Sequence, residues 1–425
     1  MKTTSNFFHR FFLLNLLNFI LLVSVCWTYV PAQNTNDYEL KQVLIFGRHH
    51  VRAPYTSEGS VLHKATNKTW PAWDVEGTWL TTKGGVLEAY LGSYTRAWLK
   101  ENGLLQANAK PQAHEFLAYA NSMQRTVATA QYFIAGAFPA YNVPVHHTLS
   151  VSNMDKLFTP AVHNDSEEFI QEVLETMQQL DKEMDLTKAY KLLDKIVAYK
   201  DSDYCREQGD CSLAKSTEPT QFTIKVGNEP SFSGRLRVAF VLVDAFNMQY
   251  YEGLPKKNIA WGKLKSKKQW KILSDVTEGV MQMLFTSGNL AQELAAPLVN
   301  YIDEHFNAAP ITADNPLVTL MIGHDSNVAT LLKALNVEDY VLPDQFEHTP
   351  IGGQLVFQRW ENTHTGEKLL KIEYVYQTRK QIREVQALNL KNPPQRVPLY
   401  LNGLKRNADG YMYWDDFKQR LQKNN

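Results

Sequence analysis

A short apolar run followed at once by a cluster of charged residues constrains the fold of this chain more than any other feature. Val43 to Phe46 is rich in residues that favour β-strands, and such a run is typical of a strand buried on both faces of a sheet. The segment Gly47-Arg48-His49-His50-Val51-Arg52-Ala53-Pro54 follows, and its proline prevents the strand from simply continuing. The pattern predicts an α/β sheet with polar side chains at the carboxyl end of a strand.

The polar residues of this segment have the chemistry of a phosphate site. Arg48 and Arg52 flank His49, and guanidinium groups stay charged and donate paired hydrogen bonds to phosphate. A histidine between them is suited to act as the nucleophile. A loop in which these residues make only structural contacts would have the same sequence pattern. Other segments of the chain must therefore decide between a catalytic site and a structural loop.

The N-terminus has the pattern of a secretory signal peptide. Basic residues precede an apolar run over residues 11–25, and Ala32 is small enough for the position before a cleavage site. We therefore expect residues 1–32 to be removed and the mature protein to have no membrane anchor. Two alternatives remain open here, an uncleaved anchor and a lipid on Cys26, although Val25 is large for the residue before a lipidated cysteine.

Charge and cysteine content narrow the class of protein further. The chain of 425 residues has 44 basic and 44 acidic side chains, a balance that disfavours a nucleic-acid partner or a polybasic membrane surface. Cys205 and Cys211 lie close together among charged and turn-forming residues, which predicts a disulfide that closes a small surface loop in an oxidising compartment. A metal site at these cysteines is less favoured, because no second Cys or His pair lies nearby.

A second segment places an arginine at the start of a helix. Residues 117–120 are typical of a short strand, which breaks at Asn121-Ser122, and either residue can cap a helix. Arg125 would then lie in the first turn, where unpaired amides and the helix dipole attract anions. An arginine that only caps the helix or faces solvent fits the same pattern.

The remaining elements divide into a helical region and a return to the sheet. From about residue 166 to 287 the chain has successive helical patterns, over residues 169–184, 186–199, 236–251 and 270–285. A second buried strand is predicted over residues 317–322, followed by Gly323-His324-Asp325-Ser326-Asn327 and a helix. This layout repeats that of the first strand, and open α/β sheets bind ligands at that edge. Residues 354–360 and 369–376 alternate like antiparallel strands.

Taken together, these segments resemble a known family. Arg48-His49-x-x-Arg52-Ala53-Pro54, Arg125 and the late His324-Asp325 pair resemble the histidine acid phosphatases, and within them the bacterial periplasmic glucose-1-phosphatases. The resemblance implies an α/β fold of the phosphoglycerate-mutase-like (histidine phosphatase) class with a mostly helical insertion domain. It also implies the domain boundaries: residues 33–155 and 288–425 for the sheet domain and residues 156–287 for the insertion, a lid or specificity domain.

The resemblance assigns roles to six polar residues. It implies a phosphate pocket of Arg48, Arg52, Arg125 and His324, with His49 as nucleophile and Asp325 as proton donor. The chemistry supports these roles, because fixed donors stabilise charge on the phosphoryl oxygens and a carboxylic acid must protonate the leaving alkoxide. The same carboxylate can then activate water. We expect an acid-shifted rate optimum, no cofactor, no metal ion and a small-molecule phosphomonoester as partner.

Substrate choice depends on a residue in the helical region. The resemblance places Glu229, in a polar loop at residues 225–230, where a carboxylate faces the sugar. A fixed acid accepts hydroxyl hydrogen bonds and repels a second phosphate. We therefore expect a periplasmic phosphatase that hydrolyses glucose 1-phosphate, with a phytase or broad-specificity acid phosphatase as the alternative. A noncatalytic phosphosugar-binding protein is disfavoured, because binding alone does not require both His49 and Asp325.

His50 departs from the glycine or asparagine usual at this position in the related enzymes. Neighbouring side chains of an extended segment point apart. A tolerated loop substitution is therefore favoured over a metal pair formed by His49 and His50.

Overall fold

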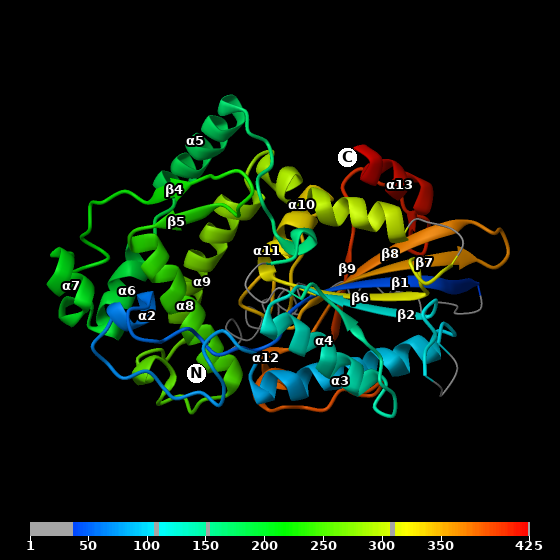
Figure 1. Cartoon of the computed structure of the whole chain (residues 1–425), viewed down its shortest axis with the longest axis horizontal. Helices are drawn as coiled ribbons and strands as arrows, with labels where there is room; N and C mark the ends of the chain where they lie inside the picture. The colour runs from blue at the N-terminus through cyan, green and yellow to red at the C-terminus, as the bar shows by residue number, and fades with distance from the viewer. Residues whose placement is uncertain (1–36, 106–109, 150–153, 307–310, 424–425) are drawn as a thin grey trace, which may run out of the picture. The chain divides into compact units, whose positions relative to one another are not determined.

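An eight-stranded sheet contains the strand predicted at Val43 to Phe46 in its middle (Figure 1). Its strands are β1 (Tyr38–Arg48), β2 (Phe116–Ala120), β3 (Val145–His146), β6 (Val318–Gly323), β7 (Gln354–Asn362), β8 (Lys368–Tyr376), β9 (Gln395–Leu399) and β10 (Met412–Tyr413). They lie in the order β10-β8-β7-β1-β6-β2-β3, and β9 pairs with β8. The α/β fold class expected from the sequence is confirmed.

The computed structural model describes residues 37–105, 110–149, 154–306 and 311–423, and residues 37–425 form a single unit. The expected signal peptide, residues 1–32, lies outside the described residues. No described helix is both long enough and apolar enough to cross a membrane.

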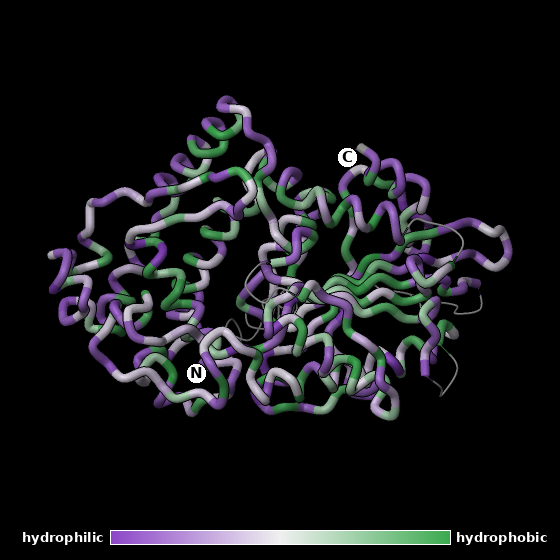
Figure 2. The backbone as a smooth tube through the Cα atoms, in the orientation of Figure 1, coloured by the Kyte–Doolittle hydropathy of each residue, from purple (hydrophilic) through white to green (hydrophobic). Residues whose placement is uncertain are grey.

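The central strand β1 has an apolar layer on each face. β1 runs parallel to β6 and antiparallel to β7, and the period of two in a strand sends alternate side chains to opposite faces. Val43 and Ile45 pack in one layer with side chains of α3 (Thr82–Glu101) and α4 (Gln124–Ala137). Leu44 and Phe46 pack in the other layer, with α10 (Leu290–Tyr301), α11 (Asp325–Ala334) and α13 (Trp414–Lys423). Figure 2 shows the resulting hydrophobic band along the strands.

Helices from the middle of the chain form a separate apolar cluster. They are α5 (Glu167–Glu183), α6 (Thr187–Val197), α8 (Arg235–Glu252) and α9 (Lys267–Met281), each close to a range predicted from its helical spacing. The short α7 (Asp203–Gln208) carries Cys205, which forms the predicted disulfide with Cys211. The mostly helical secondary structure of this region is as expected. The boundaries of the insertion domain, at residues 155/156 and 287/288, remain a prediction.

One local element is not predicted by the sequence, and one local prediction is wrong. Residues 221–223 and 231–233 form a small antiparallel hairpin, β4 (Gln221–Thr223) and β5 (Ser231–Ser233), without a predicted counterpart. Neither Asn121 nor Ser122 caps α4: the N-cap is Met123, which makes no side-chain cap hydrogen bond. The Asn121 side chain instead contacts His324.

Candidate active site

Three strands bring the predicted polar residues to one edge of the sheet. β1 and β6 pair in parallel so that Arg48 lies opposite Gly323, and β2 pairs with β6 so that Ala120 lies opposite Ile322. The residues that follow these strands, His49, His324 and Asn121, therefore emerge side by side. This is the edge at which open α/β sheets bind ligands.

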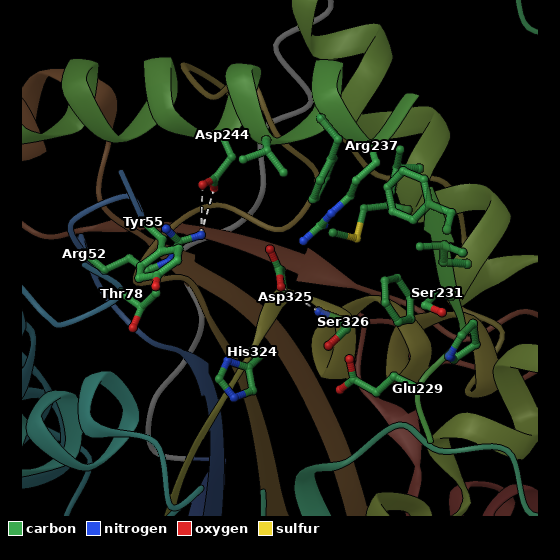
Figure 3. A pocket seen from close by; sticks show the side chains of 18 of the residues that line it. Arg52, Tyr55, Thr78, Glu229, Ser231, Arg237, Asp244, His324, Asp325 and Ser326 are labelled. Carbon is green, nitrogen blue, oxygen red and sulfur yellow. Dashed lines mark hydrogen bonds and ion pairs between the residues drawn. The ribbon is translucent and has the colours of Figure 1, made fainter. Parts of the chain in front are cut away.

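A single cavity of about 570 Å³ lies at this edge. Six of the seven predicted site residues line it: His49, Arg52, Arg125, Glu229, His324 and Asp325. Figure 3 shows four of them, Arg52, Glu229, His324 and Asp325, around the cavity. The seventh, Arg48, is buried and contacts Asp325 at 3.0 Å. The residues singled out from distant parts of the sequence thus come together.

The ring of His49 is held in one tautomer. Its Nδ1 lies 2.9 Å from the backbone carbonyl of His50, and because a carbonyl oxygen only accepts, Nδ1 must donate. The other ring nitrogen, Nε2, then has the free lone pair. Burial, followed by the charge of Arg125, holds the pKa of His49 well below its usual range. His49 is therefore neutral, as a nucleophile must be.

His324 is also held in one tautomer, by Asn121. The Asn121 Oδ1 accepts from the backbone amides of Ser122 at 2.7 Å and Asp155 at 3.0 Å. The amide nitrogen of Asn121 must therefore face His324, and it donates to Nε2 of that ring at 2.7 Å. Burial, with the charge of Arg125 next, holds the pKa of His324 well below its usual range. The neutral ring thus has its proton on Nδ1.

Two hydrogen-bond donors therefore meet without an acceptor between them. Nη2 of Arg125 lies 3.4 Å from Nδ1 of His324. Burial, with the charge of Arg52 second, lowers the pKa of Arg125 to about 10, and its Nε is buried without a partner among the described residues. A phosphoryl oxygen placed here would accept from both side chains.

The other two arginines are paired with carboxylates. Arg52 donates to both oxygens of Asp244, at 2.9 and 3.0 Å. Arg48 contacts Asp325 at 3.0 Å and Glu347 at 3.3 Å, and it donates to the carbonyl of Thr349 at 2.5 Å. Acidic side chains therefore contact two of the three arginines of the site.

Asp325 is ionised in this arrangement. It is the first residue of α11, so the helix N-terminus favours its negative charge. Burial opposes ionisation, but the charges around it, led by Arg48, outweigh burial and hold its pKa below the usual range.

Glu229 lies across the cavity, in the loop between β4 and β5. Burial, together with the charge of Asp325 and against that of Arg125, raises the pKa of Glu229 to about 7. Below that pH its carboxyl group is largely protonated. The charge repulsion expected of a fixed acid at this position therefore does not operate at acid pH.

His50 has only structural contacts. It is fully buried; its Nδ1 accepts from the Val51 amide at 2.8 Å, and its Nε2 therefore donates to Oε1 of Gln377 at 2.9 Å. Both nitrogens are thus used within the protein, which agrees with a tolerated substitution. Across the residues that the structure describes, no group of three or more His, Cys, Asp or Glu side chains is placed to hold a metal ion.

Sequence reasoning missed three polar residues that act on the predicted ones: Asn121, Asp244 and Glu347. From the sequence, Asn121 is only a candidate helix cap. Asp244 lies within a helical pattern and Glu347 in a loop, and neither has a distinctive sequence signal. Their importance depends on contacts across 192 and 299 positions of the chain.

Comparison with known proteins identifies the family of the chain. Residues 39–377 match the family described as histidine phosphatase superfamily (branch 2). The chain belongs to this superfamily. It is 48% identical over 389 residues to the glucose-1-phosphatase of Salmonella typhimurium, a match that covers 91% of this chain and 93% of the relative. The resemblance to histidine acid phosphatases is therefore confirmed.

Two further relatives place the chain within the superfamily. The glucose-1-phosphatase of Providencia rettgeri is 39% identical over 408 residues, which is 96% of this chain and 97% of the relative. The solved structure of the Hafnia alvei phytase superposes with a TM-score of 0.81 at 26% identity, covering 93% of this chain and 98% of the phytase. The histidine phosphatase fold thus extends over nearly the whole described chain.

Proposed function

We propose that this protein is an acid phosphatase that hydrolyses glucose 1-phosphate to glucose and inorganic phosphate through a phosphohistidine at His49. The observation that carries the proposal is the neutral His49 ring, whose Nε2 lone pair is free, in one cavity with Arg52, Arg125 and Asp325. The names of the Salmonella and Providencia relatives support glucose 1-phosphate as the substrate.

In the first step, the phosphate group binds among Arg48, Arg52, Arg125 and His324. Nε2 of His49 forms a bond to phosphorus as the bond from phosphorus to the C1 oxygen breaks. The charge that develops on the phosphoryl oxygens is met by preorganised guanidinium groups and the Nδ1–H of His324. Asp325 gives its proton to the departing sugar oxygen, which leaves as glucose.

Asp325 must gain a proton before this step. The dianionic phosphate neutralises the arginines that hold the pKa of Asp325 down, so substrate binding raises that pKa. Ionised Asp325 then takes a proton from water in the second step, and the water oxygen displaces His49 from phosphorus. A rate optimum at acid pH follows, because protonated Asp325 starts the cycle.

We assign Glu229 to recognition of the sugar. At acid pH its protonated carboxyl group both donates to and accepts from sugar hydroxyls, so it acts by hydrogen bonding. Residues 156–287, which include this loop, would form the specificity domain, and residues 33–155 and 288–425 the sheet domain. We further propose export to the periplasm with cleavage after Ala32, as the N-terminal pattern indicates.

A phytase is the second candidate function. The likeness to the Hafnia alvei phytase favours it, because that enzyme shares the fold at 26% identity over nearly its whole length. Two relatives that are more similar in sequence carry the name glucose-1-phosphatase, which favours the sugar phosphate.

The deciding experiment is to compare kcat/KM on glucose 1-phosphate and on phytate at acid pH with chelator present, for the wild type and for Glu229→Ala. The proposal predicts a wild-type preference for glucose 1-phosphate that shrinks in Glu229→Ala. Glu218→Ala is the control, because Glu218 is an exposed acid of the same region outside the cavity lining. Equal or better turnover of phytate by the wild type would favour the phytase, and no turnover of either substrate would favour a binding protein.

A further inference from the structure

One cation of the cavity has no role in the mechanism above. Arg237 lines the cavity from α8, on the side opposite the sheet (Figure 3). Its guanidinium group makes no hydrogen bond or ion pair with any residue that the structure describes, and its centre lies 5.6 Å from the centre of the Phe232 ring. Arg48 and Arg52, by contrast, are paired with acids. Arg237 is therefore available to a ligand.

The helix sets the distance between Arg237 and the phosphate pocket. Asp244, seven positions further along α8, contacts Arg52 of that pocket at 2.9 Å. Seven residues of an α-helix rise roughly 10 Å and return to nearly the same face. Arg237 thus faces the same cavity as the phosphate pocket. The distance along α8 between the two is about the length of a hexose ring with its substituents.

The charges around Arg237 favour an anion over a neutral hydroxyl group. Asp244, the nearest acid on the same helix face, already shares both oxygens with Arg52. Glu229 is the acid that would repel an anion on this side, and its pKa of about 7 leaves it protonated at acid pH. Much of the nearby wall is apolar, including Phe240, Met281 and Phe285. Arg237 is exposed to solvent on this side of the cavity, and its unpaired guanidinium group offers charged hydrogen-bond donors to an anion.

We propose that Arg237 forms a second anion subsite, so that the enzyme acts on hexose 1,6-bisphosphates as well as on the monophosphate. The proposal rests on the proposed function, because it assumes that the C1 phosphate binds beside His49. The phosphate on C6 then lies at Arg237 and stays on the product. Phosphorus transfers from the C1 oxygen to His49 and then to water, and Asp325 protonates O1, so glucose 1,6-bisphosphate and water give glucose 6-phosphate and inorganic phosphate.

The test measures kcat/KM on glucose 1,6-bisphosphate and on glucose 1-phosphate at acid pH, for the wild type, Arg237→Gln and Arg237→Lys. We expect the ratio of the two values, bisphosphate over monophosphate, to fall about tenfold or more in Arg237→Gln, as loss of one charge-assisted hydrogen bond predicts. Arg237→Lys should recover part of the ratio, because it keeps the charge. Lys225→Gln removes a positive charge from the neighbouring exposed loop and should leave the ratio unchanged.

Product analysis separates the subsite from the proposed function. An assay coupled to glucose-6-phosphate dehydrogenase should detect glucose 6-phosphate as the first product of the bisphosphate. An unchanged ratio in Arg237→Gln, an equal fall in Lys225→Gln, or glucose 1-phosphate as first product would overturn the subsite. Failure of the wild type to hydrolyse glucose 1-phosphate in the same assays would instead refute the proposed function.

Discussion

Replacing Glu229 by Gln tests the electrostatics of the cavity through protein stability, without depending on any substrate. Burial and the charge of Asp325 raise the pKa of Glu229 from 4.5 to about 7. The difference of about 2.5 units, at roughly 1.4 kcal/mol per unit, gives about 3 kcal/mol as the free energy that opposes ionisation in the folded protein. Because the side chain is half-buried and faces a solvated cavity, we expect about 1–3 kcal/mol.

The sign of the effect follows from the direction of the shift. A group whose pKa is raised on folding stabilises the protein fully below pH 4.5, and that stabilisation is lost as the pH rises through 7. Gln stays neutral at both pH values. Glu229→Gln should therefore match the wild type in free energy of unfolding near pH 4 and exceed it by about 1–3 kcal/mol near pH 8, as measured by urea titration.

A control with the opposite sign is available in the sheet. The largest effect on Glu373 is burial, which opposes ionisation, but the charges of Arg396 and Lys371 and the hydrogen bonds from Arg396 and Gln358 together outweigh it and lower the pKa of Glu373 from 4.5 to about 2. Glu373→Gln should therefore destabilise the protein near pH 8 and destabilise it less as the pH falls below 4.5. If Glu229→Gln has the same effect on stability at both pH values, folding does not shift the pKa of Glu229 and the reasoning is wrong.

Two further substitutions test the site and the packing. Asn121→Leu removes the donor that holds the proton of His324 on Nδ1 and leaves the backbone amides of Ser122 and Asp155 without their acceptor. We expect kcat/KM to fall about 10²-fold and the free energy of unfolding to fall by about 1–3 kcal/mol. A fall in the free energy of unfolding alone would contradict the role given to Asn121. Gly136→Ala places a Cβ against the carbonyl of Ala89, where α3 and α4 pack closely. The free energy of unfolding should fall by at least about 2 kcal/mol. An unchanged melting temperature would show that these helices separate easily.

The parts of the fold that follow from local pattern were predictable. β1 and β6 are apolar runs buried on both faces, and α8 and α9 have helical spacing over several turns, so each was found within a few residues. The hairpin β4–β5 does not follow from local pattern, because its strands are three residues long and mostly exposed, and a single polar–apolar–polar alternation is too short to mark a strand.

The site residues that could be predicted are those that follow a predicted strand or belong to a motif with a known chemical role. His49, Arg52 and Asp325 were expected at the edge of the sheet, because they directly follow strands or belong to a recognised motif, and the structure brings them together. From the sequence, Asn121 and Ser122 are both candidate helix caps, whereas the contact of Asn121 with His324 spans 203 positions and has no local signal. The protonation of Glu229 was also beyond the sequence, because it depends on burial and on Asp325.

The most direct test of the central claim is to detect the phosphorylated enzyme. Rapid quenching of the reaction with labelled glucose 1-phosphate should yield protein-bound phosphate that is stable to base and labile to acid, and peptide mapping should place it on His49. Asp325→Ala slows the second step and should prolong the intermediate when an aryl phosphate with a good leaving group replaces the sugar phosphate. Turnover without labelled protein, or label on a residue other than His49, would contradict the account.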